Sequence, residues 1–307
     1  MQRRYSLVFA SLLWAGLLLA GIQVLAQRGF VRDVPPDGSR VEYKTFASKS
    51  LNREIRYGLY LPPSYANSPT KRYPVLYFLH GLNENEMRWS TRGQTDIKLD
   101  KLVADGKIGE FIVAVPFGAT SFYTNKRSGT EPWEDMLVSE FIPMIESANR
   151  VAPGRANRGV SGISMGGYGS LKIALKHPDL FGSVSAHSAV LLANLGDARV
   201  ADRRLAMFQG LFDQIFGINQ DLTYWDQNNP MALAAETKKL NGMKIYFDCG
   251  TEDEYGFQVG AKLLDEMLTK AGYAHEAHLY PGNHGWDYGL QHTEASMLFH
   301  WKAFTGK

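Results

Sequence analysis

The stretch RGVSGISMGGYGSLKIAL, residues 158–175, decides the fold. Residues 158–163 are typical of a short buried strand, and residues 165–175 are typical of a helix. Between them stands the pentapeptide Gly162-Ile163-Ser164-Met165-Gly166. A Gly-x-Ser-x-Gly between a strand and a helix is the pattern of a nucleophile elbow, where the glycines permit the tight turn. The alternative is a glycine-rich turn that contains a serine by chance, and the placement between strand and helix favours the elbow.

Strand-like and helix-like segments alternate on both sides of this stretch. We expect further strands at residues 41–46, 54–61, 75–79, 111–115, 182–187, 243–249 and 274–280, and further helices at 136–148 and 258–271. Such alternation implies right-handed crossovers and an α/β fold with a mostly parallel, doubly wound sheet. The first two strands alternate in polarity, so they should pair antiparallel at one edge.

A helical cap is expected between the sixth and seventh strands. Residues 189–240 contain no clear strand, and residues 201–212 have helical apolar spacing. We therefore predict an insertion over one face of the sheet.

Composition excludes several classes of protein. The chain has 307 residues with 33 Lys and Arg against 31 Asp and Glu, and 45% of its residues are hydrophobic. It can bury a core, so it is not globally disordered. Its near-neutral charge, without a Lys/Arg cluster, predicts no nucleic-acid partner. The single cysteine, Cys249, excludes a disulfide framework and an all-cysteine metal site, and we expect a buried, inert thiol.

The N-terminal residues have the pattern of an export signal. Arg3 and Arg4 precede an apolar run over residues 5–22, and small residues stand before a cleavage point after Ala26. We predict a signal peptide at residues 1–26, a single mature domain at residues 27–307, and a secreted or periplasmic location, more typical of a bacterium. An uncleaved membrane anchor is the alternative. After cleavage no stable membrane association is expected.

A serine hydroxyl needs a base beside it to act as a nucleophile. In this fold the order along the chain is Ser, then Asp or Glu, then His. His284 follows the last predicted strand and so lies at the carboxyl edge of the sheet, where the elbow opens. The acid comes from the loop that holds Glu252 and Asp253. Spacing favours Asp253 and leaves Glu252 open as a substitute.

Two backbone N–H groups are also needed to stabilise the developing oxyanion. The residue after the nucleophile, Met165, supplies one. The loop after the strand at residues 75–79 supplies the other, and there Gly81 permits a turn that directs the Leu82 N–H inward.

Four ordered segments, residues 73–81, 162–169, 249–253 and 282–286, together resemble the esterase D-like esterases. That group includes feruloyl and acetylxylan esterases, tributyrin esterases, S-formylglutathione hydrolases and mycolyltransferases. The resemblance implies the α/β-hydrolase fold. It also implies a triad of Ser164, Asp253 and His284, with Leu82 and Met165 as oxyanion donors.

These patterns predict a secreted serine carboxylesterase that acts on feruloyl or acetyl esters of polysaccharides, or on related small esters. Trp89, Tyr123 and Trp286 are candidates for an aromatic wall beside the site. We expect neither a metal nor an organic cofactor, because no ligand spacing or phosphate-binding loop is present. An acyltransferase and a non-catalytic binding protein on the same fold are the alternatives. The sequence does not indicate the oligomeric state.

Overall fold

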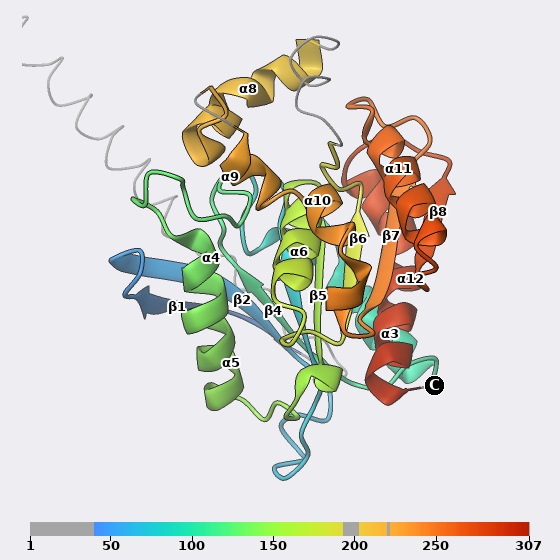
Figure 1. The fold of residues 1–307 in the computed structure, drawn as a ribbon. Coiled ribbons are helices and arrows are strands. Elements are labelled where there is room, and N and C mark those ends of the chain that lie inside the picture. The colour runs from blue at the N-terminus through green and yellow to red at the C-terminus, as the bar shows by residue number, and fades with distance from the viewer. Residues whose placement is uncertain (1–39, 193–202, 220–221, 307) are drawn as a thin grey trace, which may run out of the picture. The chain divides into compact units, whose positions relative to one another are not determined.

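A single mixed sheet organises the computed structural model, which describes residues 40–192, 203–219 and 222–306 (Figure 1). Its eight strands stand in the order β1-β2-β4-β3-β5-β6-β7-β8. β1 pairs antiparallel with β2 and β2 antiparallel with β4, while every neighbouring pair from β4 to β8 is parallel. The strand bounds are Arg40–Ser48, Arg53–Leu61, Val75–Leu79, Ile112–Pro116, Arg158–Ile163, Ser183–His187, Lys244–Gly250 and Glu276–Tyr280 for β1 to β8. The predicted parallel sheet with an antiparallel edge is confirmed.

Helices cover both faces of this sheet. α6 (Met165–Lys176), α10 (Pro230–Ala234) and α11 (Phe257–Lys270) lie on one face (Figure 1). α3 (Thr95–Ala104) and α12 (Trp286–Thr305) pack together on the other. Four further short elements are α2 (Arg88–Thr91), α9 (Thr223–Asp226), η2 (Arg155–Asn157) and η3 (Thr237–Leu240).

The predicted helix at residues 136–148 is interrupted. It consists of α4 (Trp133–Asp135), a π-helical stretch η1 (Met136–Phe141) and α5 (Ile142–Ala148). Pro143 explains the break, because it has no N–H to donate to the preceding turn. The N–H of Ile142 correspondingly reaches back five residues to the carbonyl of Leu137.

Part of the predicted cap lies outside the described residues, namely 193–202 and 220–221. The described part of residues 189–240 contains helices and no strand, and its longest helix is α8 (Arg203–Phe216). In Figure 1, α8 lies beyond one end of the sheet, whereas α10 lies over one face against α6, so the predicted position over one face holds for only part of the insertion. Phe212 and Phe216 of α8 pack against Phe122, which joins this helix to the core.

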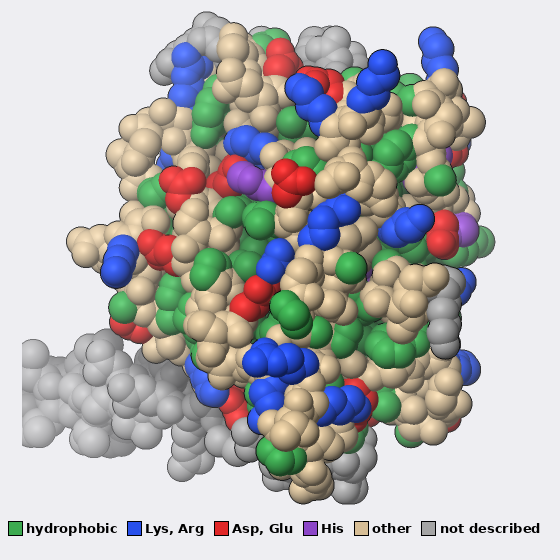
Figure 2. Space-filling view, turned by 60° about the horizontal axis from the view of Figure 1, so that its bottom comes forward, with side chains coloured by type: hydrophobic (Ala, Val, Ile, Leu, Met, Phe, Trp, Pro, Cys, Tyr) green, Lys and Arg blue, Asp and Glu red, His purple; other side chains and the backbone are tan. Residues whose placement is uncertain are grey.

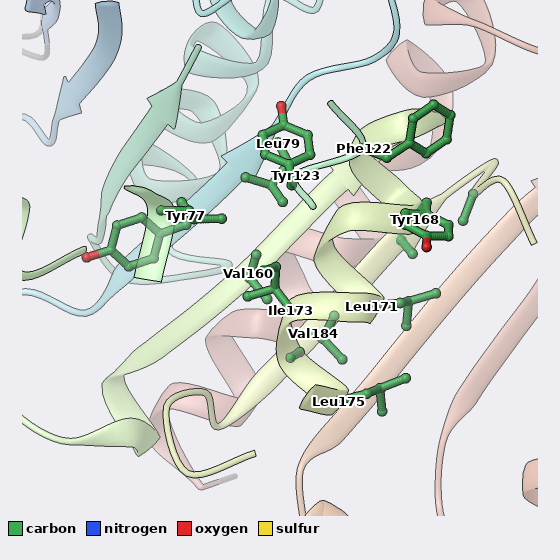
Figure 3. Packing of buried hydrophobic residues seen from close by; sticks show 14 of the residues in the cluster. Tyr77, Leu79, Phe122, Tyr123, Val160, Tyr168, Leu171, Ile173, Leu175 and Val184 are labelled. Atoms are coloured by element: carbon green, nitrogen blue, oxygen red, sulfur yellow. The ribbon is translucent and has the colours of Figure 1, made fainter. Parts of the chain in front are cut away.

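The core forms two layers because β3 is buried on both faces. Tyr77 and Leu79 belong to the cluster beneath α6, together with Leu171 of that helix (Figure 3). Leu76 and Phe78 point to the opposite face, where they join a second cluster that includes Met297 of α12. A strand covered on both sides by helices needs a continuous apolar run, which residues 75–79 provide.

A buried histidine in the second layer has partners for both of its ring nitrogens. His300 of α12 is fully buried, and its two ring nitrogens lie 2.8 Å from Ser183 Oγ and 2.9 Å from Ser185 Oγ. Burial lowers the pKa of His300 to about 3, so the ring is neutral in the folded protein. This contact fixes α12 to β6 without a charge.

No helix among the described residues is both long and apolar enough to cross a membrane. The predicted leader at residues 1–26 lies outside the described residues. Figure 2 shows acidic and basic side chains interspersed on the face in view, among apolar and neutral ones.

Acid should destabilise the fold through His300. Its pKa is lowered in the folded state from 6.5 to about 3, so the unfolded chain binds the proton first as the pH falls. The neutral ring therefore contributes stability that is complete above pH 6.5 and is lost below it. We expect His300→Gln to flatten the pH dependence of the free energy of unfolding by about 1 kcal/mol per pH unit between pH 6 and pH 4. Urea unfolding at several pH values measures this slope. An unchanged slope in the variant would contradict the assignment.

Candidate active site

Ser164 stands in a strained turn between β5 and α6. Its φ of 57° and ψ of −116° lie where non-glycine residues are rare. A Cβ on Gly162 would lie 2.2 Å from the carbonyl oxygen of Gly166, and one on Gly166 would lie 1.9 Å from that of Leu79. Only glycine fits at either position. The predicted elbow geometry is therefore present, and its two flanking glycines are required by sterics.

Backbone hydrogen bonds hold this turn in place. The N–H of Ser164 donates to the carbonyl of His187 over 2.9 Å, at the end of the neighbouring strand β6. The carbonyl of Ser164 in turn accepts the N–H of Tyr168 over 2.9 Å in the first turn of α6. These contacts offset the strain at Ser164, because they satisfy both of its backbone polar groups.

A hydrogen-bonded relay connects Ser164 to a buried carboxylate. The Nε2 atom of His284 lies 2.9 Å from Ser164 Oγ, and its Nδ1 atom lies 2.8 Å from Asp253 Oδ2. The three residues follow β5, β7 and β8, three parallel strands whose carboxyl ends meet at one edge. The side chain of Asp253 is buried, and its other oxygen accepts the N–H of Tyr255 over 3.0 Å. The serine can therefore pass its proton to a fixed imidazole.

Neighbouring carboxylates hold the histidine loop by its backbone. Glu252 accepts the N–H of Gly282 over 3.1 Å, and Glu254 accepts the N–H of His284 over 2.8 Å. Of the two acids that the sequence left open, the structure brings Asp253 to the imidazole. Glu252 is exposed and instead positions the loop.

Cys249 is buried next to this relay, as expected. Its Sγ lies 3.5 Å from Asp253 Oδ2. Burial, followed by the nearby Asp253 charge, raises the pKa of the thiol well above its usual range. The thiol is therefore protonated at neutral pH and a poor nucleophile, because the thiolate is the reactive form.

The loop after β3 is fixed by a neutral histidine. His80 is buried, and burial lowers its pKa to about 4. Its Nε2 accepts the N–H of Gly118 over 2.8 Å, so Nδ1 carries the proton and donates to the carbonyl of Gly81 over 2.8 Å. In a planar trans peptide the next N–H points opposite to that carbonyl. The Gly81 contact thus fixes the direction of the Leu82 N–H, one of the two predicted oxyanion donors. The other, Met165, is the first residue of α6.

A pocket of about 180 Å³ opens over Ser164 and His284. Tyr255 and Phe257 pack edge-on against the His284 ring, with centroids at 4.8 and 5.5 Å. Phe208 of α8 packs on Tyr255 and reaches the pocket from the predicted cap. The lining residues are Gly81, Leu82, Asn83, Glu84, Ile163, Ser164, Phe208, Tyr255, Phe257, His284, Gly285 and Trp286.

The predicted aromatic wall is only partly right. Trp286 lines the pocket, but Trp89 and Tyr123 are 2% and 0% exposed and lie in the core, so these two predictions were wrong. Trp89 packs on Tyr60, and the Tyr123 hydroxyl donates to the carbonyl of His80 over 3.2 Å. Large aromatic side chains are more often core than binding surface, and nothing in the local pattern separates the two uses.

Sequence reasoning missed several residues of the pocket, among them Glu84, Phe208, Tyr255 and Phe257. Tyr255 and Phe257 follow Asp253 closely along the chain, which is a signal that could have placed them near the relay. Phe208 comes from a distant helix and has no such signal. Within the described ranges, no group of three or more His, Cys, Asp or Glu side chains could hold a metal ion.

Comparisons with known proteins agree on one family. The family model described as "Putative esterase" matches residues 48–297. An endo-1,4-beta-xylanase/feruloyl esterase of Xylanibacter ruminicola is 36% identical over 148 residues, which is 46% of this chain and 20% of that protein. An esterase of Mycobacterium tuberculosis is 27% identical over 268 residues, 80% of this chain and 56% of that protein. The chain thus spans about half, or less, of the length of these curated relatives.

A solved structure supports the same assignment. A ferulic acid esterase superposes with a TM-score of 0.73 and 26% identity, covering 87% of this chain and 98% of that one. The predicted α/β-hydrolase fold is confirmed.

The elbow glycines yield a stability test. We expect Gly166→Ala to lower the free energy of unfolding by about 3 kcal/mol or more, because the added methyl meets the Leu79 carbonyl and the backbone has no room to move. Gly210→Ala is the matched control. Gly210 lies within α8 with open space around it, so the same change should stabilise by about 0.5–1 kcal/mol. Urea unfolding midpoints measure both. Equal midpoints for Gly166→Ala and the unmodified protein would refute the steric argument.

Proposed function

The chain belongs to the esterase family whose model spans most of its length, and on that premise we propose that it is a serine carboxylesterase. One observation carries the proposal. Ser164, His284 and Asp253 form a continuous hydrogen-bonded relay at the floor of the pocket. The serine is the nucleophile, the histidine is the general base, and the aspartate positions the imidazole.

In the first half of the reaction, Ser164 Oγ attacks the ester carbonyl while His284 Nε2 accepts its proton. Asp253 accepts the hydrogen bond from Nδ1 and stabilises the imidazolium that forms. The negative charge moves to the carbonyl oxygen, where the N–H groups of Leu82 and Met165 stabilise it. Collapse of this intermediate expels the alcohol, which takes the proton from His284 and leaves an acyl-serine.

In the second half, water replaces the alcohol. His284 accepts a proton from the water as it attacks the acyl-serine, and the same two N–H groups stabilise the new oxyanion. Collapse releases the acid, and the proton returns to Ser164 Oγ. The enzyme is then ready for another ester.

The pocket supports an aryl or short acyl substrate. Its aromatic lining, Phe208, Tyr255, Phe257 and Trp286, offers apolar faces to a flat or small group. We propose feruloyl or acetyl esters of polysaccharides, or related small esters, as the substrate class. Relatives named as feruloyl or ferulic acid esterases favour this choice.

Action outside the cytoplasm is part of this proposal. It rests on the residue pattern at the N-terminus, where Arg3 and Arg4 precede an apolar run and a cleavage context at Ala26. Polymeric plant-wall esters are met outside the cell, so export and this substrate class are mutually consistent. Residues 27–307 would then be the mature domain.

Single substitutions should separate the catalytic roles of Ser164, His284 and Asp253. With methyl ferulate, 4-nitrophenyl acetate, 4-nitrophenyl butyrate and acetylated xylan as substrates, we expect Ser164→Ala and His284→Gln to lower kcat by about 10⁵–10⁶-fold. Asp253→Asn should lower it by about 10⁴-fold, because the wrong imidazole tautomer is then favoured.

Glu252→Gln is the matched control for Asp253→Asn, because it removes the adjacent carboxylate and leaves the imidazole contact intact. We expect its kcat within about tenfold of the unmodified enzyme. Failure of the folded, unmodified protein to hydrolyse any of the four esters would overturn the proposed function. A larger loss in Glu252→Gln than in Asp253→Asn would overturn the assignment of the acid.

A further inference from the structure

Glu84 places a carboxylate in the wall of the pocket. Of the described residues that line the pocket, it is the one Asp or Glu, and none is a Lys or Arg. It stands three residues after Gly81, in the same loop as the predicted oxyanion donor Leu82. The relay described above makes no use of it.

This carboxylate is held in place by two neutral donors. Its Oε2 accepts the N–H of Gly81 over 3.1 Å, and its Oε1 accepts the indole N–H of Trp286. The first donor belongs to the loop after β3, and the second is the first residue of α12. Glu84 therefore joins the loop after β3 to the start of α12, and it cannot swing into solvent without breaking both bonds.

No cation neutralises this group among the residues that the structure describes, since none of their ion pairs includes Glu84. A glutamate carboxylate is an anion near neutral pH. Aromatic walls exclude water and weaken dielectric screening, so charges in the pocket interact more strongly than in bulk solvent. A second anion in the same pocket would be repelled.

We propose that Glu84 makes the pocket selective for charge, so that it accepts esters with a neutral or cationic group in the pocket and rejects esters with a carboxylate there. This inference rests on the proposed esterase function and deepens it. It narrows the substrate class to neutral or cationic esters. It disfavours esters that keep a free carboxylate, such as half-esters of dicarboxylic acids and hydroxy acids acylated on their hydroxyl.

Two matched series of esters test this selectivity on the acyl and alcohol sides. The acyl series is the 4-nitrophenyl esters of butyrate, 4-(trimethylammonio)butyrate and hemiglutarate. The alcohol series is the acetates of 3,3-dimethylbutanol, choline and glycolate. In at least one series we expect kcat/KM for the anionic member to be about tenfold or more below that for the neutral member. The cationic member should equal or exceed the neutral one.

Glu84→Gln removes the charge and keeps one carbonyl oxygen as an acceptor. We expect the ratio of kcat/KM between neutral and anionic esters to fall to within about twofold of unity in this variant. Because the readout is a ratio, a general loss of activity from a displaced loop does not affect it. Glu294→Gln is the control. Glu294 lies on α12, half exposed and paired with Lys107. The Glu294→Gln variant has the same net charge as Glu84→Gln. It should keep the ratio of kcat/KM between neutral and anionic esters that the unmodified enzyme shows.

The outcomes distinguish this inference from the proposed function. Hydrolysis of the neutral esters without discrimination against the anionic ones overturns the charge selectivity and leaves the esterase function standing. An unchanged ratio in Glu84→Gln, or an equal fall in Glu294→Gln, also overturns the role of Glu84. Absence of turnover on both neutral esters overturns the esterase function and this inference with it.

Discussion

The close approach of the α6 backbone to the end of β3 is the constraint on which the site depends. Gly166 lies so near the Leu79 carbonyl that even a methyl group has no room, and Gly162 is equally crowded by Gly166. This proximity forces the chain to reverse between β5 and α6, and the reversal places Ser164 in its positive-φ conformation. The fold is therefore what exposes the hydroxyl at the sheet edge. Strain at one residue is offset by the packing of the whole β3–β5–α6 unit.

Parallel strands then bring distant segments of the chain together at that edge. Asp253, His284 and Ser164 are up to 120 residues apart in sequence, yet they follow parallel strands of one sheet, β7, β8 and β5, and meet within hydrogen-bond distance. Each loop adds backbone support of its own. His80 fixes the peptide that precedes Leu82, and Glu254 holds the His284 backbone. The wall of the pocket is built largely from side chains outside the relay, such as Glu84 and Phe208.

How far the sequence predicts this structure depends on whether a signal is local. The strand at residues 75–79 was predicted to the residue, since a short apolar run bounded by Pro74 and His80 has one sensible assignment. The structure brings Asp253 and His284 within hydrogen-bond distance, and both follow neighbouring parallel strands whose order along the chain the sequence pattern indicates. Trp89 and Tyr123 were misplaced, because the local sequence around an aromatic residue gives no sign of whether it faces core or cavity. Glu84 was missed for a related reason: its partner Trp286 is about 200 residues away and no local pattern connects them.

Activation of Ser164 by His284 is the central feature of the proposed mechanism. The most direct measurement is reaction of the folded protein with an alkyl fluorophosphonate, followed by intact-mass and peptide mass spectrometry. We predict one covalent adduct per chain, on the peptide that contains Ser164, and its loss in the folded His284→Gln variant. An adduct on another residue, or labelling of Ser164 at the same rate without the histidine, would contradict the account.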